Sequence, residues 1–550
     1  MAAALVGGSF LSAFLQVLFD RMASPEIVDF FRGRKLDDGL LNKLNITLNS
    51  VEGVLDDAEE KQITKPAVKN WLNNLRDAAY EADDLLDEIA YGALQSKHEV
   101  VSRRKKVRNF FSSRNPFKKG LVEAKLEEIL ERLEYLVKQK DALGLREGIG
   151  EKPSTCKIQT TSLVDESGIY GRDDDKEAIM KLLLSDDGNG NGVGVIPIVE
   201  EFDVSKITKD ILEGVTRKKS DTHILNQLQL ELEEVLMEKK FLLILDDVWN
   251  DQYADWDILR MPLKSGAKGS KIIVTTRNES VALVMRTVPT HNLKELNADH
   301  CWSLFAKHAF DDGNPNAHCD LEVIGREIVR KCKGLPLAAK TMGGLLRSKT
   351  DVEEWKKVLN NKLWNLTSDS ILPALRLSYH YLPSHIKQCF AYCAMFPKDY
   401  NFKKQELVFL WMAEGLLVQS QGNKELEEVG EEYFNILVSR TLFQPSSGNQ
   451  SGLVMHDLIH DLAILVSGEF SFRLEADNSC KVDRMVRHLS YTRTKHDATD
   501  KFEAIYEAKF LRTLFPVELS RLPPRKCMDN EVMQTLLLTF GHLRVLSLSP

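Results

Sequence analysis

The chain has 550 residues, of which 43% are hydrophobic and 28% charged, and its formal net charge is −8 at pH 7. This length exceeds what one hydrophobic core supports, so we expect several domains. The composition is that of an ordinary globular protein, and the acidic balance argues against a general nucleic-acid binder. Cys389 and Cys393 would share a helix face, but no second pair completes a zinc site, which favours buried free thiols.

The first nineteen residues carry no charged side chain. A signal peptide or a membrane span is disfavoured, because no basic residue precedes the run and small residues such as Gly7 and Gly8 interrupt it. Apolar residues recur at helical spacing at Leu11, Leu15, Leu18 and Met22. We therefore expect an amphipathic helix that packs in a bundle, with membrane contact as the alternative.

Residues 1–145 show helical periodicity in four segments, which predicts a four-helix bundle. Between the third and fourth segments, Ser102–Gly120 holds eight basic residues and no acidic one. We interpret this run as a solvated loop, with a nucleic-acid patch as the alternative. We expect the bundle to self-associate or to pair with related bundles, through its apolar first helix and an acidic face made by Glu81, Asp83, Asp84, Asp87 and Glu88.

A polar linker at 146–167, with Gly148 and Pro153, leads into a section that alternates strands and helices. The expected strands are Val193–Val199, Phe241–Leu245 and Lys271–Thr275, and the expected helices between the first two strands are Lys206–Val215 and Asp221–Glu238. Such alternation predicts a parallel sheet, and ligands of parallel sheets bind at the carboxyl ends of the strands. The side chains that fall there are Asp246, Asp247, Thr276 and Arg277.

A strand that ends in two aspartates is one half of a phosphate and magnesium site. The other half is a glycine-rich loop, G-x-x-x-x-G-K-[ST], directly after the first strand. Here Val199 is followed by Glu200, Glu201 and Phe202, and the motif occurs nowhere in the chain. The glycine-rich run Gly188–Gly194 precedes the strand and holds no lysine, so it reads as a surface loop.

The region from about 295 to 480 returns to helical periodicity, and the last seventy residues contain short apolar runs. The runs "LRTLF" and "LRVLSLS" have the Leu-x-x-Leu spacing of a leucine-rich repeat. About three stacked repeats are needed for a stable solenoid. We therefore expect 481–550 to be the start of a repeat array that is poorly ordered by itself, because its leucines need a following repeat to cover them, among them Leu514, Leu537, Leu543, Leu546 and Leu548.

Six motifs, in this order, give the chain a family resemblance. They are "YEADDLLDE", "GIYGRDDDKEAI", "LLILDDVWND", "GSKIIVTTRN", "GLPLAAK" and the pair "CFAYCAMFPKDY" and "VMHDLIHDLA". With them the chain resembles the plant intracellular immune receptors of the coiled-coil, nucleotide-binding, leucine-rich-repeat type. The resemblance covers nearly the whole chain.

The resemblance implies a multidomain α and α/β fold. Its parts would be a coiled-coil-type helical bundle at 1–145, a linker at 146–167, an NB-ARC α/β subdomain at 168–292, a helical subdomain at 293–368, a winged-helix subdomain at 369–480 and the start of leucine-rich repeats at 481–550. It also implies ADP or ATP with Mg²⁺ as cofactors.

The resemblance assigns each expected site residue a role. Tyr170, Gly171 and Arg172 would lie along the adenine, with Pro336 packed against the base. Arg277 would face the terminal phosphate. His456 would touch bound ADP and Asp457 would fix the turn. Asp246 would hold Mg²⁺, and Asp247 would orient a water.

In the family the first strand leads into the glycine-rich loop, a helix and a second strand, and here this unit of on the order of 30 residues or more is missing after Val199. We expect an immune-receptor relative whose ADP/ATP switch is impaired and which has no ATPase activity. The alternative is a nucleotide-independent helper or decoy that acts through the N-terminal bundle. The implied partners are related receptors and a pathogen effector or guarded host protein, not nucleic acid. The implied location is the cytoplasm, with plasma-membrane contact by the first helix as the alternative.

Overall fold

The computed structural model describes 8–24, 27–28, 30–31, 38–62, 65–101, 119–146, 169–184, 194–195, 204–218, 220, 222, 224–246, 248, 250–310, 319–347, 349–365, 372–418, 424–446, 452–474, 482–492, 502–517 and 530–547. It forms two compact units. One consists of Met1–Glu166 with Cys301–Pro550, and the other of Ser167–His300. The basic run at 102–118 and the junction Val199–Phe202 lie outside the described residues.

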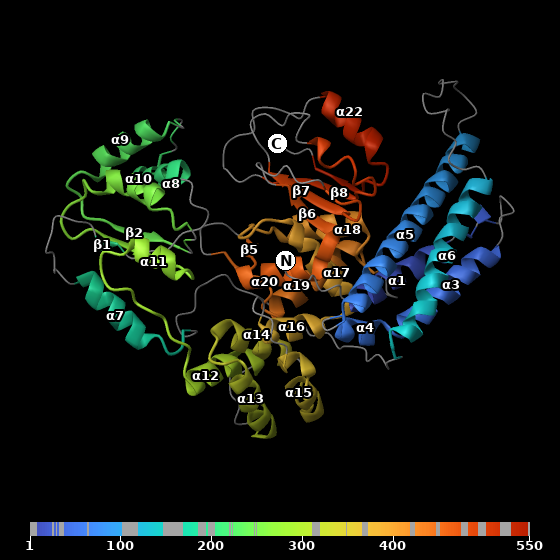
Figure 1. Ribbon diagram of the computed structural model, residues 1–550, viewed down its shortest axis with the longest axis horizontal. Helices are drawn as coiled ribbons and strands as arrows, with labels where there is room; N and C mark the ends of the chain where they lie inside the picture. The colour runs from blue at the N-terminus through green and yellow to red at the C-terminus, as the bar shows by residue number, and fades with distance from the viewer. Residues whose placement is uncertain are drawn as a thin grey trace. The chain divides into compact units, whose positions relative to one another are not determined.

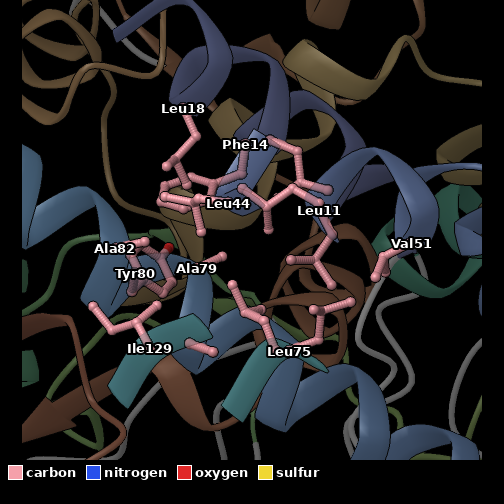
Figure 2. Close-up of a cluster of buried hydrophobic side chains, with 14 of the residues drawn as sticks. Leu11, Phe14, Leu18, Leu44, Val51, Leu75, Ala79, Tyr80, Ala82 and Ile129 are labelled. Carbon is pink, nitrogen blue, oxygen red and sulfur yellow. The ribbon is translucent and has the colours of Figure 1, made fainter. Parts of the chain in front are cut away.

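The N-terminal bundle contains α1 (Gly8–Met22), α3 (Asp38–Glu52), α4 (Leu55–Lys61), α5 (Pro66–Val101) and α6 (Lys119–Ala142). The second predicted helical segment is split into α3 and α4 at Gly53, a residue that weakens helices. Figure 2 shows how side chains from α1, α3, α5 and α6 meet in one core, including Leu11, Phe14, Leu44, Leu75 and Ile129.

The apolar stripe of α1 is buried as expected for a bundle helix. Leu11, Leu15 and Leu18 have no exposed surface. The helix packs against α3, α4 and α5, and also against α17 (Ser384–Tyr392), which lies far along the chain. Within the described residues, no helix combines the length and the apolar character that crossing a bilayer requires.

A helical subdomain follows the α/β unit in the sequence, with α12 (Ala298–Ala309), α13 (Cys319–Lys331), α14 (Pro336–Leu346), α15 (Val352–Leu359) and η3 (Lys362–Asn365). Its core is aromatic. Trp302 stacks on Phe305 with ring centroids 5.5 Å apart, and Phe305 meets Trp355 edge-on at 5.9 Å. Gly325 is required here, because a Cβ atom would lie 2.8 Å from the Trp302 ring.

The winged-helix part comprises α16 (Pro373–His380), α17, η4 (Cys393–Met395), α18 (Lys404–Glu414), α19 (Leu426–Ser439), α20 (Asp457–Ser467) and an antiparallel pair, β4 (Gln444–Pro445) and β5 (Leu453–Val454). Cys389 and Cys393 are buried on α17 and η4, where burial raises the pKa of both thiols. Among the residues that the structure describes, no group of three or more potential metal ligands occurs.

The C-terminal strands form a parallel sheet in strict chain order, after the short helix η5 (Gly468–Phe470). They are β6 (Ser471–Leu474), β7 (His488–Thr492), β8 (Thr513–Val517) and β9 (Val545–Leu546), with α22 (Asn530–Thr539) before the last. Neighbouring parallel strands in chain order are the arrangement of a stacked repeat array. The sheet is packed on one side, against expectation: Leu514 is fully buried, and Phe515, Val517 and Val545 join the winged-helix core. Of the other leucines expected to lack cover, Leu537 is exposed, Leu543 and Leu546 are half-buried, and Leu548 lies outside the described residues.

The unit Ser167–His300 is built on a parallel sheet, as the alternation of strands and helices predicts. It contains α7 (Asp173–Leu184), β1 (Gly194–Val195), α8 (Val204–Thr216), α9 (Leu225–Leu236), β2 (Leu242–Leu245), α10 (Tyr253–Leu263), β3 (Lys271–Val274) and α11 (Glu279–Met285). The strand order is β1-β3-β2, so β2 is an edge strand among the described residues. The multidomain α and α/β fold class is confirmed.

Among the described residues, the two faces of this sheet are covered to different extents. In register, Leu243 lies beside Ile272 and Leu245 beside Val274, and these side chains share a core with residues of α8, α9 and α10, which lie together on one side of the strands (Figure 1). On the opposite face Leu242 and Ile244 are 54% and 57% exposed. Parallel sheets are normally covered by helices on both faces, so at β2 the described residues leave this second face without its usual cover.

Candidate functional site

The carboxyl ends of β2 and β3 bring the predicted phosphate-side residues together. Asp246 directly follows β2 and is exposed, and the Thr275 hydroxyl donates a hydrogen bond of 2.8 Å to its Oδ1. The Val248 amide donates to the Thr275 carbonyl at 3.0 Å, and the Thr276 hydroxyl donates to the Val248 carbonyl at 2.5 Å. Asp247 lies outside the described residues.

Arg277 and the start of α11 complete this edge of the sheet. Arg277 is exposed and directly precedes Asn278, whose side chain caps α11 by accepting a hydrogen bond of 3.0 Å from the Ser280 amide. The Ser280 hydroxyl in turn donates to Asp251 at 3.2 Å. This cap fixes the chain direction directly after Arg277.

The predicted adenine-side residues form a turn held by ionic contacts. Gly171 has φ +65°, in the left-handed region that glycine adopts without strain. Arg172 donates to Asp175 at 3.0 Å and to the Lys294 carbonyl at 2.8 Å. His291 makes a 2.8 Å contact with the other oxygen of Asp175. Hydrogen bonds from His291 and Arg172 lower the pKa of Asp175, which stays ionised and holds the turn against the segment before α12.

Gly171→Ala should destabilise this unit by about 1–3 kcal/mol. A Cβ atom at this position would lie 2.3 Å from His300 Nδ1, and the backbone would keep its positive φ. Gly214→Ala is the matched control, because no atom lies within 4 Å of its added Cβ and alanine favours helix α8. Hydrogen exchange of the β2 and β3 amides measures both effects. Equal protection in the two variants would contradict a special requirement for glycine at 171.

Pro336 and His456 belong to the other compact unit, and each lies at the start of a helix. Pro336 is the first residue of α14, where the missing amide of proline costs no helical hydrogen bond. His456 is the N-cap of α20, and its Nδ1 accepts a hydrogen bond of 3.2 Å from the Leu458 amide. Both side chains are therefore placed by the local geometry of a helix N-terminus.

On the side expected to hold phosphate, the described residues supply one carboxylate and one guanidinium, those of Asp246 and Arg277. The residues that directly follow β1 lie outside the described part of the chain. Asp246 already accepts the Thr275 hydroxyl. The sequence motif G-x-x-x-x-G-K-[ST], which supplies several backbone amides and a lysine to a diphosphate, is absent from the chain.

A second cluster of charged residues lies in the larger unit, and we name it the arginine–aspartate cluster. It joins acidic residues of α5 to arginines of α1, α6 and the C-terminal sheet, namely Asp77, Asp83, Asp84, Asp87, Arg21, Arg132, Arg487, Arg512 and Arg544. Asp83 is at its centre and contacts Arg21 at 2.8 Å, Arg512 at 2.8 Å and Arg544 at 2.6 Å.

The centre of the cluster is buried, whereas Arg21, Arg132 and Asp87 at its border are partly exposed. The side chains of Asp83 and Arg512 are each 1% exposed. Burial by itself would raise the pKa of Asp83, but the charges of Arg544, Arg512 and Arg21 outweigh it and hold that pKa well below the usual carboxyl range. For Asp84, burial outweighs Arg512 and raises the pKa. Arg512 also lies over the Tyr80 ring, 4.5 Å from its centroid.

The acidic face of α5 is therefore occupied within the chain. Glu88 pairs with Lys125 at 2.9 Å, and Glu81 pairs with Arg132 at 2.9 Å. Arginines of the C-terminal sheet contact Asp83, Asp84 and Asp87 of this face. The expected self-association of the bundle stays a prediction.

Sequence reasoning missed the three arginines of the C-terminal sheet, although a signal for them exists. Arg487, Arg512 and Arg544 each directly precede a strand and occupy the same place in "RHL", "RTL" and "RVL". Equivalent positions of successive parallel strands stack on one side of a repeat array, so the three guanidinium groups reach one acidic helix.

Three protein-family models match the chain. The Rx N-terminal domain matches 10–116, the NB-ARC domain 180–314 and the disease resistance protein winged helix domain 395–463. A disease resistance RPP13-like protein 1 of Arabidopsis thaliana is 42% identical over 588 residues, covering 99% of this chain and 55% of the relative. The chain belongs to the NB-ARC family of plant disease resistance proteins.

Other members of the NB-ARC family share less identity over similar lengths. Disease resistance protein RGA2 of Solanum bulbocastanum is 36% identical, with 92% of this chain and 54% of the relative covered. Disease resistance protein RPM1 of Arabidopsis thaliana is 28% identical, with 80% and 55% covered. The chain thus spans about half the length of these curated relatives. The recognition of the family from its motifs is confirmed.

Proposed function

We propose that this chain is a defence-related member of its family in which the NB-ARC unit holds ADP or ATP weakly and does not hydrolyse ATP. The carrying observation is the uncovered face of the sheet, where Leu242 and Ile244 are exposed. A loop, helix and strand inserted after the first strand would supply both the phosphate-binding amides and the apolar cover for a sheet face.

The length of the alignment supports the same proposal. The alignment with the RPP13-like protein extends over 588 positions, 38 more than the 550 residues of this chain. The relative therefore holds at least 38 residues without a counterpart here. A loop, a helix and a strand require on the order of 30 residues.

Loss of the phosphate loop explains the weak binding in energetic terms. Hydrogen bonds to a charged group contribute about 1.5–3 kcal/mol each. Three lost donors correspond to at least ~5 kcal/mol, or about a thousandfold in affinity. Glu200 and Glu201, next to the end of the first strand in the sequence, add negative charge that repels phosphate. Within this proposal Asp246 is the candidate Mg²⁺ ligand, Asp247 orients a water, and Tyr170–Arg172, Arg277, Pro336 and His456 contact the nucleotide.

The wider role follows from the family. We assign the chain to immune signalling in the cytoplasm, with related receptors, a pathogen effector or a guarded host protein as partners, and with the domain division at 145, 167, 292, 368 and 480. The second candidate is a nucleotide-independent helper or decoy acting through the N-terminal bundle. Because arginines of the C-terminal sheet occupy the acidic face of α5, a partner can bind that face only after α5 and the sheet separate.

Calorimetry with ADP and Mg²⁺ on the full chain tests the nucleotide proposal. We expect no saturable binding below millimolar ADP, and no ADP released when the purified protein is denatured. ATP hydrolysis should equal the rate of the buffer blank. Asp246→Ala is the comparison, and it should change none of these readings. Stoichiometric ADP in the purified protein, or a micromolar dissociation constant, would show that other groups replace the missing loop.

A further inference from the structure

Among the described residues, no strand pairs with the backbone groups on the outer edge of β2. The Lys271 amide donates to the Phe241 carbonyl at 2.9 Å, and the Thr275 amide donates to the Leu245 carbonyl at 3.2 Å. Alternate residues of a strand point the same way, so the amide and carbonyl of Leu242 and Ile244 point away from β3. No described strand pairs with β2 on that side.

The side chains of this edge form an exposed row on one face of the sheet. By the same alternation Lys240, Leu242, Ile244 and Asp246 point to one face, and all four are exposed. The row begins with a cation, ends with an anion and is apolar between them. Natural edge strands usually carry a charge or a proline within the strand that prevents pairing, and β2 has neither.

We infer that this edge is a docking surface for a second copy of the chain, whose β2 pairs antiparallel with the first. The pairing is centred on Leu243, where a twofold axis relates the two strands. Leu242 then lies opposite Ile244 of the second copy, and their outward backbone groups form hydrogen-bonded pairs. The two sheets become one continuous sheet with a shared apolar patch on its uncovered face.

The charges of the row select this arrangement. In the antiparallel register, Lys240 lies opposite Asp246 of the second copy, and the twofold axis repeats the pair. A parallel arrangement would instead place lysine beside lysine and aspartate beside aspartate, which is unfavourable. The surface is thus self-complementary, which is the requirement for a twofold interface between identical chains.

The surface does not depend on nucleotide. The docking surface and the proposed loss of ADP binding both rest on the exposed side chains of β2. The two have separate tests, because calorimetry measures ADP binding and the molecular mass in solution measures the pairing. A chain that binds ADP and still dimerises through β2 would separate the two inferences.

Charge exchange across the pair is the test, with the full chain studied by analytical ultracentrifugation. The unsubstituted chain should show a monomer–dimer equilibrium. Lys240→Glu alone and Asp246→Lys alone each create two like-charge contacts, so each should raise the dimer dissociation constant about tenfold or more. A mixture of the two variants should form heterodimers, because each cross-strand contact then joins opposite charges.

Two leucines of similar exposure give the matched control. Leu242→Lys places a charge in the apolar part of the row and should abolish the dimer. Leu230→Lys, on α9 with 58% exposure against 54% for Leu242, should leave the dimer unchanged. A strictly monomeric chain, a dimer that resists Leu242→Lys, or single variants that self-associate better than their mixture would each overturn the inference. So would a surface that binds only a different NB-ARC protein.

Discussion

Asp83→Ala is expected to lower the free energy of unfolding of the full chain by about 3–5 kcal/mol. The substitution removes the carboxylate at the centre of the arginine–aspartate cluster and leaves Arg512 and Arg544 buried with one partner fewer. Uncompensated buried charge costs far more than the loss of an exposed pair. Urea unfolding measures the loss in the free energy of unfolding, and hydrogen exchange of the α5 and β8 amides shows whether the loss is local to the cluster.

Glu88→Ala is the matched control on the same helix. Glu88 and Lys125 form a partly exposed pair, with side chains 30% and 42% accessible, so its removal should cost about 0–1 kcal/mol. The double variant Asp83→Ala with Arg512→Met should lose less than the sum of the single variants, because the two residues share one interaction. An Asp83→Ala loss no larger than that of Glu88→Ala would mean that the cluster contributes little to stability.

The same cluster predicts a dependence on acid. Folding lowers the pKa of Asp83, so Asp83 stabilises the fold above its ordinary pKa of about 4. That contribution declines as pH falls below about 4 and is fully lost only below the folded-state pKa. The difference in stability between the unsubstituted chain and Asp83→Ala should therefore shrink in acid and be flat above about pH 5.

Insertion of a loop, helix and strand between Val199 and Glu200 is expected to raise the affinity for ADP at least about a thousandfold. The segment would come from the RPP13-like relative, chosen to include its glycine-rich loop. Its helix and strand should also cover Leu242 and Ile244, so the β2 amides should become more protected from exchange.

A glycine-serine insert of equal length controls for the added chain and should restore neither ADP binding nor protection. The complete insert with alanine in place of the loop lysine should restore protection of β2 but only part of the affinity, because that lysine contacts the phosphates. Protection without any gain in affinity would mean that other phosphate-side groups are also lost.

The fold could be predicted from sequence wherever periodicity was strong. The apolar stripe of α1 predicted a buried helix, and the apolar runs at 241–245 and 271–275 predicted parallel strands. The exposure of Leu242 and Ile244 was not predicted from the apolar run. The break between α3 and α4 was missed, since one glycine interrupts a pattern that continues on both sides. The packing of the C-terminal strands was also missed, because their cover comes from the winged-helix part, far away in the sequence.

The site could be predicted only where its residues are neighbours along strands. Asp246, Thr276 and Arg277 follow two paired strands, so register alone brings them to one edge. Asp83, Arg512 and Arg544 meet across more than 400 residues, and no local pattern encodes that contact. The acidic run was noticed, but its partners lie in repeats whose leucines gave a stronger signal than the arginines before them.

Helix α1 has apolar neighbours on two sides, and this affects how the chain can be divided. Phe14 packs on Tyr80 of α5 with ring centroids 4.6 Å apart, while the helix also packs against α17, and Phe470 belongs to the bundle core. A fragment that ends near residue 145 would expose the α17-facing side of α1 and uncover Asp83 and Asp84. Association of such a fragment would then occur through a surface that is buried in the full chain, and it would not identify a natural interface. Residues more than 200 positions later in the chain therefore bury part of the surface of the N-terminal bundle.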